Sequence, residues 1–194
     1  MAQLTLTQDN PQVRRAIRVL ARELRDHHRA TAEHSHRLAH LSRRLADTMG
    51  LDPLAATEVE LVAVLHDVGK LAVPAEILDH DGPLDDLKRH IMRRHTIAGE
   101  EILMTVSGLE HLGRIVRATH EHWDGGGYPD GISGTTIPIE ARIVSCADAF
   151  DAMTSDRAYR RALETAEACK RIERDAGRQF DPLVAAALLQ LVCA

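Results

Sequence analysis

Apolar side chains recur at helical spacing along most of this 194-residue chain. Val13, Ile17, Leu20 and Leu24 repeat every three or four positions, which is the period of one face of an α-helix. Similar patterns predict helices at about 31–49, 53–66, 84–103, 109–122, 139–153, 164–176 and 182–192. Prolines at or just before several of these starts, and Gly50 after the second helix, fit the usual ends of helices. No segment reads convincingly as a strand, so the expected fold class is all-α, a helical bundle.

Composition narrows the class of protein. Hydrophobic residues make up 44% of the chain but aromatic residues only 3%, so an aliphatic core of packed helices is expected. The net charge of -5 argues against general binding to nucleic acid polymers or anionic membranes. The first ten residues lack the apolar core of a signal peptide, and no stretch is long and apolar enough to span a membrane. Cys146, Cys169 and Cys193 show no CxxC spacing, so we expect no disulfide framework and a cytoplasmic protein.

The segment from Leu61 to Lys70 carries the first chemical signal. A run of apolar residues ends in the adjacent pair His66 and Asp67, whose imidazole nitrogen and carboxylate oxygens are suitable ligands for a divalent cation. The second carboxylate oxygen would allow Asp67 to bridge to another metal ion. Gly69 is expected to end the helix, and Lys70 to place a positive charge where an anionic substrate meets the metal. Alone, a His-Asp pair is more often an ordinary helix end.

Further histidines and acids lie at or near the ends of successive predicted helices. Together with the first pair they give six possible ligands, which is more than the four that hold a structural zinc ion. The six residues are His34, His66, Asp67, His95, His120 and Asp148. Asp148 and Asp151 lie in an apolar helical run, where a carboxylate is costly to bury unless it is paired or bound to metal. A glycine-rich segment at 124–131 contains Tyr128, whose ring offers a stacking face and a hydroxyl.

The order of these motifs resembles that of an HD-GYP domain, a branch of the HD metal-dependent phosphohydrolase superfamily. The resemblance runs from His34 nearly to the C-terminus. The matching segments are His34-Ser35, His66-Asp67-Val68-Gly69-Lys70, His95-Thr96-Ile97-Ala98-Gly99, His120-Glu121-His122-Trp123-Asp124-Gly125-Gly126-Gly127-Tyr128-Pro129, Ala141-Arg142-Ile143, Ala147-Asp148-Ala149-Phe150-Asp151-Ala152-Met153-Thr154, Arg157-Ala158-Tyr159-Arg160 and Gly177-Arg178-Gln179-Phe180-Asp181-Pro182.

This resemblance implies an HD-type helical bundle with two divalent transition-metal ions, most often Fe or Mn, with Zn, Ni or Mg left open. It implies hydrolysis of cyclic di-GMP to pGpG, with GMP as a further product left open, and assigns catalytic roles to Asp67 and Lys70. The implied ligands of one ion are His34, His66, Asp67 and Asp148, with Asp67 as the bridge to a second ion held by His95 and His120. The positions implied to contact the substrate are Lys70, Gly127, Tyr128, Pro129, Arg157 and Arg160.

Two departures from the family pattern bear on the metals. Thr119 stands where the family usually has the first of two adjacent histidines, and a hydroxyl is a poor transition-metal ligand, so the second site is expected to bind more weakly. His122 lies one turn away as an alternative ligand, although a surface histidine is the more ordinary interpretation. Ala30 stands where three-metal members carry Glu, which disfavours a third ion.

The expected organisation is an N-terminal amphipathic helix at 1–29, which would connect to a sensor domain or partner, followed by a catalytic domain at 30–194. Two other functions stay open at this stage. One is a weakened module that binds nucleotide or partner proteins in signalling, and the other is an HD phosphohydrolase acting on another cyclic nucleotide. A cyclic dinucleotide is the expected ligand, and a homodimer or a signalling partner protein is left open.

Overall fold

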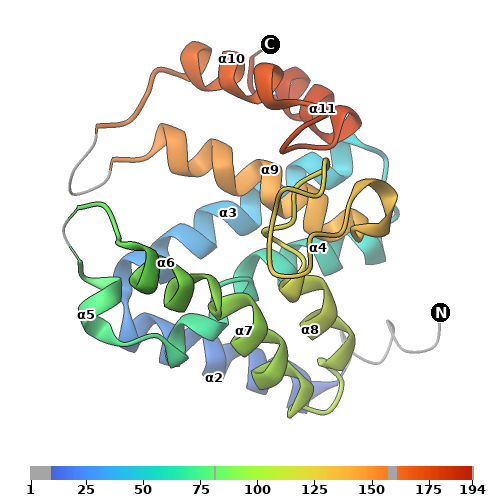
Figure 1. Cartoon of the computed structure of the whole chain (residues 1–194). Coiled ribbons are helices and arrows are strands. Elements are labelled where there is room, and N and C mark those ends of the chain that lie inside the picture. The colour runs from blue at the N-terminus through green and yellow to red at the C-terminus, as the bar shows by residue number, and fades with distance from the viewer. Residues whose placement is uncertain (1–9, 81, 157–160, 194) are drawn as a thin grey trace.

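The computed structural model describes residues 10–80, 82–156 and 161–193, apart from the side chains of residues 29, 30 and 32. Within these ranges the regular structure is helical, with one isolated β-bridge between Ala176 and Phe180 and no strand, so the all-α prediction is confirmed (Figure 1). The elements are α2 (Pro11–His27), α3 (Arg29–Thr48), α4 (Pro53–Leu65), the 3₁₀ helix η1 (Val68–Ala72), α5 (Ala75–Leu78), α6 (Asp86–Arg93), α7 (His95–Met104), α8 (Glu110–Arg117), the 3₁₀ helix η2 (Gly134–Thr136), α9 (Ile139–Thr154), α10 (Thr165–Asp175) and α11 (Pro182–Val192).

Three helices begin with the same local chemistry. The side chains of Asn10, Asp52 and Asp181 each accept a hydrogen bond from a backbone N–H in the first turn of α2, α4 and α11. A proline follows each of these residues, and its missing N–H costs nothing in the first turn of a helix. These starts therefore follow directly from the sequence.

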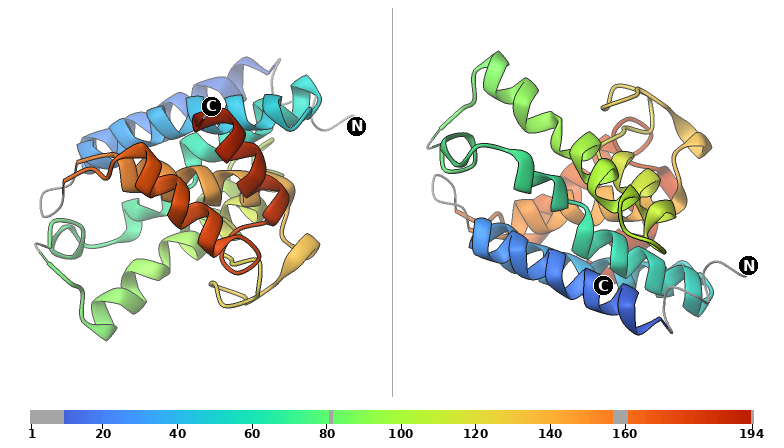
Figure 2. Two further views of the ribbon diagram at one scale, coloured as in Figure 1. Left: turned by 90° about the horizontal axis from the view of Figure 1, so that it is seen from above. Right: turned by 90° about the horizontal axis from the view of Figure 1, so that it is seen from below.

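Helices α3, α4 and α9 pack against one another at the centre of the bundle, and α10 and α11 cover α9 and α3 (Figure 2). Helix α4 is apolar on most of its surface, and Val62, Ala63 and Leu65 are completely or almost completely buried. Leu38 and Leu45 of α3 are also fully buried. This arrangement fixes one turn of α3, the end of α4 and the middle of α9 relative to one another.

The 3₁₀ helix η1 lies directly against α7, and this contact explains Gly69. The prediction that Gly69 ends the preceding helix is wrong, because α4 already ends at Leu65 and Gly69 lies inside η1. A Cβ atom on Gly69 would fall 2.8 Å from the carbonyl carbon of His95 and closer still to its oxygen. Glycine is needed here because two backbones approach each other more closely than any side chain would allow.

The described residues contain one disulfide, which the expectation of no disulfide framework did not anticipate. Cys169 of α10 and Cys193, which caps α11, form a disulfide, while Cys146 is buried in α9 and takes no part in one. The two cysteines lie 24 residues apart in the chain, and the packing of α10 against α11 brings them together. Because that packing is tertiary, cysteine spacing alone does not reveal the bond. The cytoplasmic location stays a prediction.

Helix α2 packs along α3 and buries Val13 and Leu24, while its arginines face outward. Whether residues 1–29 also connect to a sensor domain or partner stays a prediction. Among the residues that the structure describes, no helix combines the length and the apolar character required to cross a bilayer.

Candidate metal centre

The six predicted metal ligands converge on one cavity of about 400 Å³. His34 comes from α3, and His66 and Asp67 follow the end of α4. The others come from the start of α7, the turn after α8 and the middle of α9. Residues that are more than 100 positions apart in the sequence thus share one site: His34, His66, Asp67, His95, His120 and Asp148.

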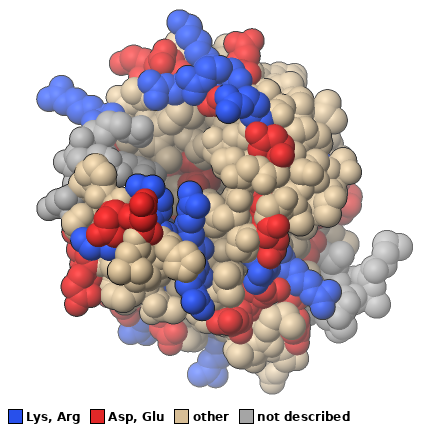
Figure 3. Space-filling model, in the orientation of Figure 1, with Lys and Arg blue, Asp and Glu red and all other residues tan. Residues whose placement is uncertain are grey.

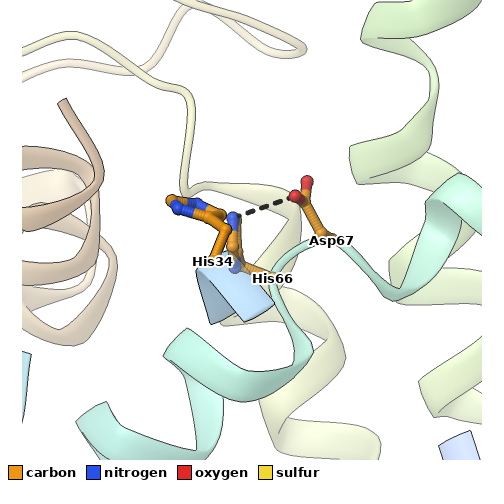
Figure 4. A group of neighbouring side chains, drawn as sticks. All are labelled: His34, His66 and Asp67. Atoms are coloured by element: carbon orange, nitrogen blue, oxygen red, sulfur yellow. Dashed lines mark ion pairs between the residues drawn. The ribbon is translucent and has the colours of Figure 1, made fainter. Parts of the chain in front are cut away.

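Within this set, two groups of three side chains could each hold a metal ion. His34, His66 and Asp67 form the first group, and Figure 4 shows how they face one another. Asp67, His95 and His120 form the second group. In each group the potential ligand atoms lie within 4.8 Å of one another. Asp67 is common to both groups, which is the geometry expected of a carboxylate that bridges two ions.

The hydrogen bonds of two histidines fix which ring nitrogen faces the site. Nδ1 of His66 lies 2.8 Å from the carbonyl oxygen of Ala63, and Nδ1 of His95 lies 2.7 Å from that of Met92. Because a carbonyl oxygen only accepts hydrogen bonds, each Nδ1 carries the hydrogen and each neutral ring presents a lone pair at Nε2. Such a bond to the outer nitrogen is typical of histidines that bind metals.

These lone pairs point at a group that is itself an acceptor. Nε2 of His66 lies 3.3 Å from Oδ2 of Asp67, and Nε2 of His95 lies 3.5 Å from Oδ1. All three residues are buried, with no more than 3% of their surface exposed. A nitrogen lone pair and a carboxylate oxygen cannot hydrogen-bond to each other without a shared proton or cation. A divalent cation would satisfy both groups.

His120 adds a third imidazole. Nε2 of His120 and Nε2 of His95 are buried and have no hydrogen-bond partner among the described residues. Burial, together with the neighbouring His95, lowers the pKa of His120 to about 3, and burial also lowers the pKa of His95. Both rings are therefore neutral ligands at neutral pH, and the orphaned nitrogens fit a bound transition-metal ion.

His34 has a different environment, between two carboxylates of α9. Its Nε2 lies 2.9 Å from Oδ1 of Asp148, and its Nδ1 lies 2.7 Å from Oδ2 of Asp151. Burial alone would lower the pKa of His34, but the bonds to Asp148 and Asp151 outweigh it and raise the pKa to about 9. A cation bound by Nε2 and Asp148 would replace that proton. Asp148 contacts His34 but joins neither group of three.

Asp151 is a contributor that was not among the predicted site residues. Its Oδ2 accepts from His34, while its Oδ1 accepts a 3.1 Å hydrogen bond from Nε of Arg37. The pair with Arg37 therefore holds the carboxylate that orients the ring of His34. The sequence carried a signal for this role, because Asp151 lies three positions after Asp148 in an apolar helical run.

Lys70 is in the cavity, with Nζ 2.6 Å from Oδ2 of Asp67. Burial would raise the pKa of Asp67, but the adjacent imidazole of His66 and the ammonium group of Lys70 together lower it well below its usual range. Asp67 is thus a carboxylate at neutral pH. On the face shown in Figure 3, basic side chains border a recess, which agrees with local positive charge on an otherwise acidic protein.

The Gly-Tyr-Pro segment also reaches the site. Tyr128 lines the cavity, and its ring stacks on His120 with 5.1 Å between centroids and 6° between planes. The guanidinium of Arg93 lies over the same ring, 4.9 Å from its centroid. Gly127 packs so closely against the backbone of Glu121 that a Cβ would lie 2.6 Å from its carbonyl carbon. Pro129 follows Tyr128 through a cis peptide bond and is not one of the residues that line the cavity.

The segment after this motif is held by a buried carboxylate. Oε1 of Glu121 accepts hydrogen bonds from the backbone N–H groups of Asp130, at 2.6 Å, and Gly131, at 3.0 Å. Arg117 donates hydrogen bonds to Asp130 through Nε and to Glu100 through Nη1. The loop that carries Tyr128 is thereby fixed to α7, which begins with His95, and to α8, which precedes His120.

Some of the remaining predicted positions lie outside the described residues, and others form no part of the two groups. Arg157 and Arg160 lie outside the described residues, so their predicted contacts with substrate stay predictions. Thr119 is buried and its hydroxyl donates to the carbonyl oxygen of Val116 at 2.8 Å, and neither Thr119 nor His122 belongs to either group. The side chain of Ala30 is also outside the described part.

The chain is similar to a family of HD domains and to proteins named as cyclic di-GMP phosphodiesterases. Residues 18–184 match the family described as HD domain. The chain is 40% identical over 163 residues to a protein named cyclic di-GMP phosphodiesterase from Thermotoga maritima, covering 83% of this chain and 44% of that protein. It is 36% identical over 182 residues to the cyclic di-GMP phosphodiesterase response regulator RpfG from Xanthomonas campestris pv. campestris, covering 91% of this chain and 47% of the relative. The chain therefore spans less than half the length of these relatives.

A solved structure extends the similarity to the fold. The structure of Bd1817, a HDG"Y"P protein from Bdellovibrio bacteriovorus, superposes with a TM-score of 0.68 at 22% sequence identity. The match covers 83% of this chain and 52% of that chain. At this identity the likeness concerns the arrangement of helices alone.

Proposed function

Because the chain belongs to the HD domain family, and to its HD-GYP branch, we propose that it is a metal-dependent phosphodiesterase that hydrolyses cyclic di-GMP to pGpG. The observation that carries the proposal is the convergence of two imidazole nitrogens on the two oxygens of Asp67, at 3.3 and 3.5 Å. This arrangement is poorly satisfied without cations and well suited to two of them.

The proposed centre holds two divalent ions, with Fe or Mn as the leading candidates. His34, His66, Asp67 and Asp148 would hold one ion, and Asp67 would share the other with His95 and His120. When bound, such ions supply positive charge at the phosphoryl oxygens and lower the pKa of water. The two orphaned nitrogens of the second group support this assignment.

The protein's own side chains would bind and orient the substrate. Lys70 lies beside Asp67 at the edge of the cluster, so its ammonium group is placed to donate to a phosphate oxygen held there. Asp151 and Arg37 hold the ring of His34 in place. Tyr128 closes the side of the cavity next to His120. Each of these residues acts by fixing positions rather than by forming a covalent bond.

The ligand is proposed to be a cyclic dinucleotide rather than a nucleic acid polymer. A net charge of -5 disfavours general attraction to polyanions, whereas one lysine next to a metal cluster suits a single phosphodiester. The names of the relatives favour a working hydrolase over a module that only binds nucleotide. We propose a cytoplasmic location, as a small nucleotide substrate suggests. A homodimer or a signalling partner protein stays a prediction.

Anaerobic purification, metal analysis and a turnover assay with cyclic di-GMP test this function. We expect close to two ions per chain and release of pGpG. The variant Asp67→Asn keeps the size of the side chain but removes the shared charge, and we expect it to lose bound metal and at least about 100-fold in turnover. His90→Ala, at an exposed histidine of α6, is the control and should match the wild type. Wild-type turnover by Asp67→Asn would refute the proposed centre.

A further inference from the structure

The cavity has a second wall that the proposed chemistry does not use. It is built by α5, the segment after it and the junction of α6 with α7, at one end of the molecule (Figure 2). Its lining is apolar except for one histidine: Ile77, Leu78, Leu84 and Met92 surround this side together with His80. An apolar surface with one polar group is typical of a site that contacts the face of a ring and recognises its edge.

The contact between His80 and Lys88 determines what this polar group offers. Nζ of Lys88 lies 3.4 Å from Nδ1 of His80. An ammonium group only donates hydrogen bonds, so Nδ1 must be the acceptor and Nε2 must carry the ring hydrogen. His80 is half-buried and lines the cavity. It therefore brings an N–H donor to this wall.

A cyclic dinucleotide has two halves, and the metal ligands engage only the phosphodiester that is cleaved. We infer, on the basis of the proposed function, that the α5–α6 wall binds the half that is not cleaved, with apolar side chains against the purine and the Nε2–H of His80 donating to its edge. Guanine presents acceptors at O6 and N7, whereas adenine replaces the O6 acceptor with an amino donor. A donor on His80 that meets O6 therefore favours guanine, whereas N7 is an acceptor in both purines.

Steady-state kinetics of His80→Ala and His80→Gln test this inference on two kinds of substrate. Cyclic di-GMP has a second half to contact the wall, and bis(p-nitrophenyl) phosphate has only the diester to be cleaved. Loss of one hydrogen bond made equally to substrate and transition state should raise KM for cyclic di-GMP about 10-fold in His80→Ala and leave kcat unchanged. Turnover of the small diester should stay within about twofold, because it does not reach the donor.

The second variant and two controls sharpen the result. His80→Gln retains an N–H donor and should recover part of the KM for cyclic di-GMP, which a purely structural role would not produce. His90→Ala on α6 removes an exposed histidine and should leave both substrates unaffected. Cyclic di-AMP, measured as substrate or as competitive inhibitor, distinguishes the acceptor. A change limited to cyclic di-GMP supports a bond to O6 of guanine. Equal losses for both dinucleotides would place the donor on N7 or on the second phosphate and overturn the assignment to guanine.

Failure of the inference differs from failure of the proposed function. If the wild type hydrolyses cyclic di-GMP and His80→Ala leaves its KM unchanged, the wall does not bind the distal half. If His80→Ala slows the small diester as much as the dinucleotide, the residue acts on the metal centre or on folding, and the inference is overturned. If the wild type cleaves the small diester but neither binds nor cleaves any cyclic dinucleotide, the proposed function itself is wrong.

Discussion

Gly69→Ala is the smallest change that should separate the two groups of metal ligands. Gly69 lies in η1, and the added Cβ would fall directly on the backbone of α7, 2.8 Å from the carbonyl carbon of His95. Ordinary contact begins at about 3.4 Å, so η1 and α7 must separate by at least the 0.6 Å difference. Since the obstructing atoms belong to the backbone, no change of rotamer relieves the clash.

The structure sets the size of the effect. Overpacking a core usually costs about 1–3 kcal/mol, and a clash between backbones belongs at the upper end, so we expect Gly69→Ala to lower the free energy of unfolding by about 3 kcal/mol. His95 moves with α7, whereas ligand distances in metal sites vary by only about 0.2 Å. A shift of 0.6 Å or more should therefore remove the ion of the second group. His34 and His66 lie on other elements and should retain the first ion.

Gly99→Ala is the matched control, since Gly99 lies in α7 at the same contact. There the nearest atom to an added Cβ is Cγ1 of the Val116 side chain at 3.0 Å, which can move. Alanine also favours the helix over glycine by about 1 kcal/mol, so the net change in stability should be within about 1 kcal/mol. Urea unfolding of metal-free protein and mass spectrometry of bound metal measure both effects. If Gly69→Ala keeps wild-type stability and both ions, the close approach of η1 to α7 does not position His95.

Three further changes test individual contacts of the site. The pKa of His34 is raised from 6.5 to about 9 in the metal-free protein, so the protonated ring stabilises the fold by at most about 3 kcal/mol. This stabilisation is complete below pH 6.5 and is lost as the pH rises through 9. Urea unfolding should show this decline in the wild type, and a His34→Gln variant that shows the same decline would contradict the assignment. Thr119→Val should leave metal content unchanged, because the hydroxyl already bonds to a backbone carbonyl, and loss of one ion would show instead that it is a ligand. Arg93→Met removes a cation–π contact worth about 1 kcal/mol from Tyr128, whose ring packs on His120. The second ion should therefore bind about fivefold more weakly in a metal titration. An unchanged affinity would show that this contact does not support the site.

The helices follow largely from local sequence, because periodicity and caps act over a few residues. The helix that follows Asp52 begins where the sequence predicts it, and α9 and α11 lie close to their expected ranges. Local reasoning failed where a distant element decided the outcome. Gly69 is required by α7 rather than by a helix end, and Cys169 meets Cys193 through the packing of two helices.

The site shows the same division between local and tertiary information. The types of ligand could be predicted from the residues, and the resemblance to HD-GYP domains named all six predicted metal ligands, which lie among the residues that line the cavity. The role of Asp67 in both groups is a feature of the fold, because His34 and His95 reach it from different helices. The support that Asp151 gives to His34, and the Nε2–H that Lys88 selects on His80, depend on contacts that spacing cannot specify.

The end of α4 explains how neighbouring residues can serve one centre. Successive side chains of a continuing helix point about 100° apart, which would direct His66 and Asp67 to different partners. Instead α4 ends at Leu65, and Asp67 has φ -99° and ψ 6°, outside helical geometry. The following 3₁₀ turn places side chains three positions apart above one another, so Lys70 returns to Asp67. Between them, Gly69 leaves room for α7 to bring His95 against the other oxygen. A helix extended through this segment would preserve every one of these residues and still lose the site.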